Sequence, residues 1–159
     1  MEVEYDKLAE QLFISHNKIR EDPKSFIIKL KKWSKKFRDK TIFLLNENTL
    51  ETFDGINGIE EAIRFLSIQK PVPKLTYSEE LSKAAKDHAI DIGEHNLYGH
   101  DGSNGSMLSD RIEKYTEWDD ACSESIDLGF KTADNIILNL LIDDGSERRD
   151  QRINLFSTK

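Results

Sequence analysis

The spacing of apolar and polar residues predicts a chain built mainly of helices. Apolar residues recur at three- and four-residue steps, which places them on one face of a helix. The first predicted helix covers residues 5–20 and is ended by Glu21-Asp22-Pro23, and a second begins at Pro23, which suits a first turn. The same reasoning predicts further helices over 59–69, 79–94, 107–115 and 132–142.

The helix predicted over 79–94 has the clearest sequence signals. Ser78 is a suitable cap, and Glu79 and Glu80 place negative charge in the first turn. Its predicted buried stripe consists of Leu81, Ala84, Ala85, Ala89 and Ile92, with His88 beside it.

The segments between these helices offer little regular structure. Residues 41–58 combine the apolar run Ile42 to Leu45 with polar and glycine breaks, which predicts a long loop. Residues 121–130 are the best candidate for a strand. We therefore expect an α+β, helix-rich fold with few short strands, in a single domain over 1–159, because no linker or repeat marks a boundary.

Composition narrows the choice of partners. A net charge of −7 and a pI near 5.2 disfavour nucleic acid, whose binding needs clustered Lys and Arg. Residues 29–40 form a basic exception that fits a solvated helix face, an acidic protein surface or anionic lipid, so peripheral membrane contact stays open. No apolar stretch approaches the roughly 20 residues of a transmembrane helix, so we expect a soluble protein.

Cysteine usage and the N-terminus favour a cytoplasmic or other reducing intracellular compartment. Cys122 is the only cysteine, which excludes a disulfide within the chain. It fits a small buried thiol better than a nucleophile, since no base lies near it in sequence. The acidic start lacks the pattern of a secretory signal.

Two groups of residues could carry chemistry. His88, Asp91 and His95 would share one side of a helix and could bind zinc or a similar ion; alternatively, His88 packs in the core and His95 is solvated. The glycine-rich segment 99–106 could hold His100 for metal binding or proton transfer, or be a structural turn. Glu124 would need a partner if it points inward, and His100 is the obvious one; an outward Glu124 fits equally well.

The order of motifs resembles the CAP superfamily (SCP-like, pathogenesis-related proteins), in particular its cysteine-poor bacterial and protist members. The resemblance rests on His16-Asn17-x-x-Arg20-x-x-Pro23, Glu60-Glu61-Ala62-Ile63-x-Phe65-Leu66, Lys74-Leu75, Leu81-x-x-Ala84-Ala85-x-x-His88-x-x-Asp91, Gly99-His100-x-Gly102-Ser103-Asn104-Gly105-Ser106, Arg111, Tyr115, Glu124-Ser125-Ile126 and Ile142-Asp143-Asp144-Gly145. The resemblance implies an α-β-α sandwich whose cavity is lined by two histidines and two acidic residues, which bind a divalent ion in some members. His100 then matches the first histidine, and Glu124 matches the acid of the Glu-Asn-Ile segment.

Several departures from the family pattern reduce that expectation. Ser125 replaces the Asn, Gln151 replaces a histidine, and the chain ends at Lys159, before the strands that bring the second cavity histidine. One histidine and one carboxylate are too few for a tight metal site, so we assign no cofactor and no metal or catalytic residue, with His100 and Glu124 as the only candidates. The sheet would also be incomplete and leave apolar surface uncovered.

These arguments favour a non-catalytic CAP-like binding or scaffold module that docks in a larger protein assembly. One alternative is a hydrolase-like or divalent-metal-binding domain that uses His100 and Glu124. Another is a module that binds lipid or sterol, as CAP relatives do.

Overall fold

A computed structural model describes residues 4–43 and 49–158. The chain divides into two compact units, which we describe separately. The core unit consists of Met1–Leu75 and Asp127–Thr158, and the α4 unit consists of Thr76–Ile126. The single domain expected over 1–159 stays a prediction.

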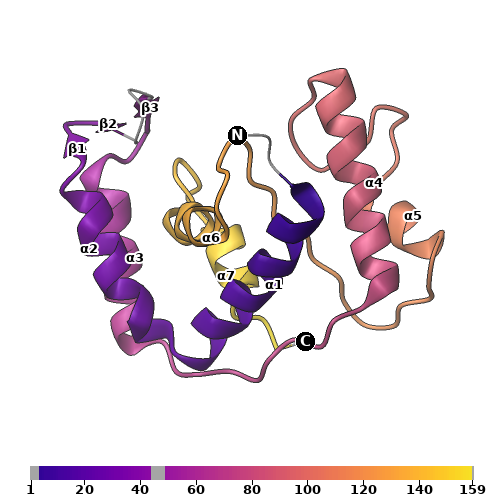
Figure 1. The fold of residues 1–159 in the computed structure, drawn as a ribbon, viewed down its shortest axis with the longest axis horizontal. Helices are drawn as coiled ribbons and strands as arrows, with labels where there is room; N and C mark the ends of the chain where they lie inside the picture. Colours follow the sequence, from indigo (N-terminus) through magenta and orange to yellow (C-terminus); the bar gives the residue numbers. More distant parts are fainter. Residues whose placement is uncertain (1–3, 44–48, 159) are drawn as a thin grey trace. The chain divides into compact units, whose positions relative to one another are not determined.

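Helices dominate the core unit (Figure 1). Its elements are α1 (Tyr5–Glu21), the 3-10 helix η1 (Pro23–Phe26), α2 (Ile27–Ser34), β1 (Phe37–Arg38), β2 (Thr41–Phe43), β3 (Thr49–Glu51), α3 (Ile56–Ile68), α6 (Ala133–Ile142) and α7 (Asp150–Asn154). α1 packs against α6, α2 packs against α3, and α3 also contacts α6. The helices predicted over 5–20, 59–69 and 132–142 are therefore confirmed, with ends that differ by three residues or fewer.

α6 lies at the centre of the apolar core. Its buried residues are Ala133, Ile136, Ile137, Leu138, Leu140, Leu141 and Ile142. Within α6 only Asp134 is exposed, so most of the helix surface must be covered by other elements. The cover includes Ile19 of α1, Leu30 of α2 and Leu66 of α3, all fully buried. The position of the other core helices thus follows from the need to enclose α6.

The three strands form one antiparallel sheet in the order β1-β2-β3. Phe37 pairs with Ile42, and Ile42 pairs with Leu50. The loop predicted over 41–58 is therefore wrong for β2, β3 and the start of α3. The hairpin of β1 and β2 turns at Asp39, whose φ is 56°, and it buries Ile42 fully. Its strands are too short to show an alternating pattern in the sequence. Leu44 and Leu45 lie outside the described residues.

The strand predicted over 121–130 is also wrong, because this segment is irregular in the structure. Its backbone is held by side chains instead of a sheet ladder. In the core-unit part, the carboxylate of Asp127 accepts hydrogen bonds from Asn139 Nδ2 (2.7 Å) and from the backbone N–H of Phe130 (3.4 Å). The α+β, helix-rich class is confirmed, with its strands in a different part of the chain than expected.

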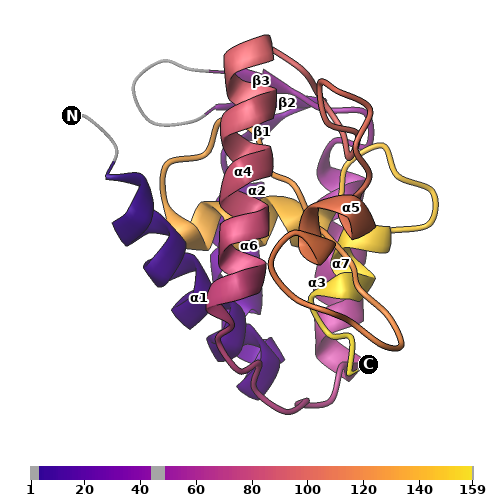
Figure 2. The same ribbon diagram turned by 90° about the vertical axis from the view of Figure 1, so that its right-hand side faces the viewer.

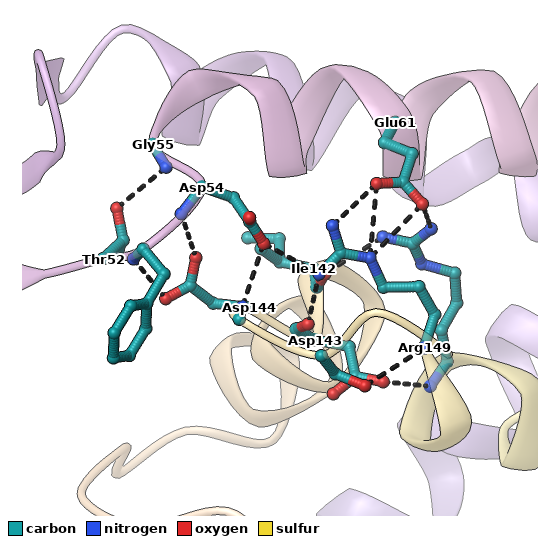
Figure 3. A network of polar contacts seen from close by, with 12 residues as sticks. Thr52, Asp54, Gly55, Glu61, Ile142, Asp143, Asp144 and Arg149 are labelled. Carbon is teal, nitrogen blue, oxygen red and sulfur yellow. Dashed lines mark hydrogen bonds and ion pairs between the residues drawn. The ribbon is translucent and has the colours of Figure 1, made fainter.

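An ionic network joins α3 to the segment that follows α6 (Figure 3). The guanidinium of Arg149 donates to Glu61 Oε2 (2.7 Å), to Asp54 Oδ2 (2.8 Å) and to the carbonyl of Asp143 (2.6 Å). Arg152, which is almost fully buried, donates to Glu61 Oε1 (2.6 Å) and to the carbonyl of Ile142 (3.0 Å). Hydrogen bonds from Arg149, and then from Arg152, hold the pKa of Glu61 below its ordinary value.

Two aspartates at the end of α6 complete this junction. The carboxylate of Asp144 accepts from the backbone N–H groups of Phe53 (2.8 Å) and Asp54 (2.9 Å), just before α3 (Figure 3). The carboxylate of Asp143 accepts from the backbone N–H of Gln151 (2.9 Å) at the start of α7. The turn after α6 therefore positions the start of α3 and of α7.

A second junction lies at the end of α1. Arg20 is buried and donates to the carbonyls of Pro73 (2.8 Å) and Leu155 (2.9 Å). His16 Nε2–H donates to the same Leu155 carbonyl (3.0 Å), and Asn17 bonds both backbone groups of Leu75. The His-Asn-x-x-Arg motif thus fastens two distant segments to α1.

We predict that Arg152→Ala lowers the free energy of unfolding by about 3 kcal/mol, because Glu61 loses one of its two arginine partners and the carbonyls of Leu141 and Ile142 lose a buried donor. Arg148→Ala is the matched control: the Arg148 side chain is 84% exposed and pairs with Asp150, so its removal should cost less than about 0.5 kcal/mol. Urea unfolding followed by circular dichroism measures both. Equal effects of the two variants would contradict the prediction.

His16 should make stability depend on pH. Burial lowers the pKa of His16 in the folded chain, whereas in the unfolded chain it titrates near its ordinary value of about 6.5. Below that pH the unfolded state binds more protons, so the free energy of unfolding should fall as pH falls from about 6.5 towards the folded pKa. His16→Gln, which can still donate to Leu155, should remove this part of the dependence. Urea unfolding of both chains between pH 5 and 8 tests it; parallel curves would contradict it.

Candidate functional site

The candidate site lies in the α4 unit, which contains α4 (Glu79–His95) and α5 (Leu108–Glu113). Figures 1 and 2 show α5 beside α4. Ser78 Oγ accepts the backbone N–H of Leu81 (3.2 Å), as the sequence predicts for a cap, and Asn96 ends α4 in the left-handed conformation with a φ of 51°. The helices predicted over 79–94 and 107–115 are confirmed, the second being shorter at both ends.

Glu124 is the centre of the site. Its side chain is only 12% exposed, and both carboxylate oxygens accept hydrogen bonds from Arg111 Nη2, at 2.9 and 3.0 Å. His100 Nδ1 lies 2.8 Å from Glu124 Oε1, and His88 Nε2 lies 3.8 Å from the same oxygen. The structure therefore brings together His100 and Glu124, the two candidates from the sequence, and places Arg111 and His88 beside them.

His88 and Arg111 hold the glycine-rich segment in place. His88 is almost fully buried, and its Nε2–H donates to the carbonyl of Gly99 (3.0 Å). Arg111, equally buried, donates from Nη1 to the carbonyls of His100 (3.0 Å) and Ser106 (3.1 Å). From the sequence, Arg111 stands out only within the family resemblance. No local pattern points to it, because its partner Glu124 lies 13 residues away across an irregular segment.

Asp91 fixes the middle of the same segment. Its carboxylate accepts hydrogen bonds from the hydroxyl and the backbone N–H of Ser103, and these two bonds hold the pKa of Asp91 below its ordinary value. The neighbouring Gly102 has no room for a side chain, since an added Cβ would lie 2.4 Å from Ser106 Oγ. The segment 99–106 is thus packed tightly at Gly102, whereas Gly99 and Gly105 are open and have a positive φ.

The ligand set suggested by the spacing of His88, Asp91 and His95 does not form. His88 contacts Gly99 and Asp91 accepts from Ser103, while His95 Nδ1 lies 2.9 Å from the carbonyl and 3.2 Å from the carboxylate of Asp91. Within residues 4–43 and 49–158, no three His, Cys, Asp or Glu side chains are grouped so that they could hold a metal ion.

The predicted buried stripe of α4 is only partly correct. Ala84 and Ile92 are buried, but Leu81, Ala85 and Ala89 are exposed. The spacing correctly predicted a helix, but one side of the predicted stripe is exposed. Cys122, expected to be a buried thiol, is half-buried.

The family of this chain follows from a match to the model of the Cysteine-rich secretory protein family, CAP, over residues 14–157. The match covers nearly the whole sequence, so the chain belongs to the CAP family, as the order of its motifs indicated. Neither the curated proteins nor the solved structures gave a match.

The described part of the chain contains no helix with both the length and the apolar character needed to span a bilayer.

We predict that Glu124 anchors the α4 unit. Glu124→Ala should speed amide hydrogen exchange in α4 and α5 by more than tenfold, because the buried Arg111 loses its bidentate partner. His100→Ala is the control: its side chain is 57% exposed, so the same amides should change by less than about fivefold. Hydrogen exchange read by mass spectrometry measures both, and a similar response to the two substitutions would contradict the anchoring role.

Proposed function

We propose that this CAP protein is a non-catalytic protein-binding module that docks in a larger assembly through its α4 unit. The supporting observation is the small apolar core of that unit: its buried apolar residues are Ala84, Ile92 and Ile112. Its large apolar residues at the surface are Tyr77, Leu81, Ile90, Leu97, Tyr98, Met107, Tyr115 and Trp118. Exposed apolar surface on this scale is typical of protein interfaces.

The exposed side of α4 is the surface that best suits a partner. Leu81, Ala85, Ala89 and Gly93 recur at four-residue steps and are all exposed. An added Cβ at Gly93 would meet no atom within 4 Å, so there is free space beside this end of the stripe. Small residues let another backbone approach closely, and Leu81 offers a large side chain at one end. The fitting partner is an apolar, extended or helical segment of another protein chain.

The contacts of Glu124 favour binding over acid–base chemistry. Its oxygens are shared between Arg111 and His100, so the carboxylate charge is already compensated. A carboxylate whose oxygens are occupied in this way is a poor metal ligand. The alternative that uses His100 and Glu124 in hydrolysis or metal binding therefore has less support.

Cavity lining, net charge and cysteine content bear on the remaining alternatives. The cavity in the α4 unit is lined mainly by polar residues, which gives the lipid-binding alternative little support there. A net charge of −7 disfavours nucleic acid as the partner, and the single Cys122 favours a reducing compartment.

Leu81→Asp tests the docking surface. The tagged chain, its Leu81→Asp variant and its Ile68→Asp variant are isolated from cells of the source organism, and copurifying proteins are quantified by mass spectrometry. Ile68 is a matched control because it is an exposed apolar residue at the end of α3, in the core unit. We expect one protein to be lost with Leu81→Asp and retained with Ile68→Asp. The Leu81→Asp variant would bury an unpaired charge at the interface. Its affinity for that protein, measured with both proteins purified, should therefore be about 100-fold lower.

Two results would overturn the proposal. One is a purified chain that stays monomeric and unfolds in a single cooperative transition that includes the α4 unit. In that case no copurifying protein would be lost with Leu81→Asp and retained with Ile68→Asp. The other is an enzymatic activity that His100→Ala abolishes while Leu81→Asp leaves it unchanged.

A further inference from the structure

A basic surface covers the outer side of α2 and of η1, the 3-10 helix before it, in the core unit. Residues 23–38 contain seven Lys and Arg and no Asp or Glu, in a chain whose net charge is −7. The two sides of this segment have opposite character. Its large buried side chains are Phe26, Leu30, Trp33 and Phe37, and its exposed ones include Lys24, Ile28, Lys31, Lys32 and Lys35.

The five exposed residues lie along one face because of their spacing. Ile28 follows Lys24 by four residues, and Lys31, Lys32 and Lys35 follow at steps of three and four. These steps bring side chains together on the surface of a helix. Ile28, in the middle of the lysines, is 62% exposed. We refer to these five residues as the α2 basic face.

No carboxylate among the described residues forms an ion pair with the four lysines of the α2 basic face. Lys29, which does have an acidic partner, lies off this face: its Nζ is 2.6 Å from Asp134 Oδ2 and 4.2 Å from the centre of the Phe26 ring. Like charges at steps of three and four residues repel one another on a helix. The face would therefore be stabilised by an anionic partner.

The composition of the face selects among anionic partners. Aromatic residues and Arg, with its planar fork, are typical of protein interfaces, whereas Lys is depleted there. Single-stranded nucleic acid stacks its bases on aromatic side chains, and none of the five residues is aromatic. A bound peptide also needs a groove or a strand edge to fix its backbone, and the exposed ridge of one helix provides neither.

The surface of an anionic bilayer has none of these requirements. A Lys ammonium on its flexible stem can follow mobile headgroups without a fixed geometry. Ile28 can enter the layer between the headgroups and the acyl chains, while the lysines around it stay at the level of the headgroups. The apolar side of α2 is already buried in the core, so the contact stays at the surface of the bilayer. Four to eight Lys or Arg on one helix are typical of such a contact.

We infer that the α2 basic face binds the surface of bilayers that contain anionic lipids, and that it responds to the density of negative charge instead of one particular headgroup. Each Lys held near such a surface strengthens binding about fivefold, so four should favour it over a neutral bilayer on the order of 500-fold. This inference does not rest on the proposed docking, because that surface belongs to the α4 unit.

Binding is measured by cosedimentation of the full chain with sucrose-loaded vesicles. The vesicles contain phosphatidylcholine alone or with about 30 mol% phosphatidylserine or phosphatidylglycerol, in about 50 mM salt, where screening is weak. The two anionic mixtures should bind the chain equally, and neutral vesicles should bind it on the order of 500-fold more weakly. Raising the salt to about 300 mM should release most of the bound chain.

Variants locate the contact. Lys31→Gln/Lys35→Gln should weaken binding to anionic vesicles about 25-fold. Lys7→Gln/Lys18→Gln is the matched control, because it removes two exposed lysines of α1 with the same change in net charge; its effect should be less than about twofold. Ile28→Ser should weaken vesicle binding about threefold and leave binding to poly-L-glutamate unchanged, since only a bilayer offers an apolar layer.

Four results would overturn the inference. The first is that anionic vesicles bind the chain no better than neutral ones at low salt. The second is an equal loss with the control pair, because net charge would then decide binding. The third is a strong preference for one anionic headgroup. The fourth is that poly-L-glutamate binds at least as tightly as anionic vesicles and that Ile28→Ser affects neither, which would make the face a site for an acidic protein.

Discussion

The core unit depends on one carboxylate, that of Glu61, which binds the guanidinium groups of Arg149 and Arg152 at once. The last residues of α6, Leu140 to Ile142, are buried, so their carbonyls are shielded from water and need donors from the protein. Arg152 supplies them, but a buried cation is tolerated only when it is itself paired. Glu61 therefore lets an arginine complete the end of the central helix, and it joins α3 and α7 to that end.

The α4 unit uses the same chemistry with only a small apolar core. Glu124 holds Arg111, which fixes the backbone around His100, much as Glu61 holds the arginines near α6. In the core unit the ionic network is added to a large set of buried aliphatic side chains, whereas in the α4 unit it is the main source of order. A unit ordered mainly by charge pairs keeps its shape at the site and leaves its apolar residues for contact with other molecules.

The sequence predicted what depends on short-range periodicity. The apolar spacing identified α1, α3, α4 and α6 because these helices are long and each has a covered side. The strands were not predicted because segments of two or three residues show no alternation of apolar and polar positions. The turn at Asp39 also has a left-handed backbone conformation, which the residue type alone does not predict. The segment around Glu124, predicted as a strand, is irregular, and its glutamate turns inward towards Arg111. The pairing of His100 with Glu124 was one of two alternatives open from the sequence, whereas the contact between Arg111 and Glu124 required the fold.

The bond between α1 and the carbonyl of Leu155 has a consequence for how the protein is made. The core unit is assembled from both ends of the sequence, with the α4 unit inserted between residues 75 and 127. The ribosome releases α1, α2 and α3 long before α6, the helix that they enclose. Their apolar faces towards α6 must therefore stay uncovered at least while residues 69–132 are added, and the core can close only after α6 has emerged. During that interval the nascent chain is a natural client for chaperones.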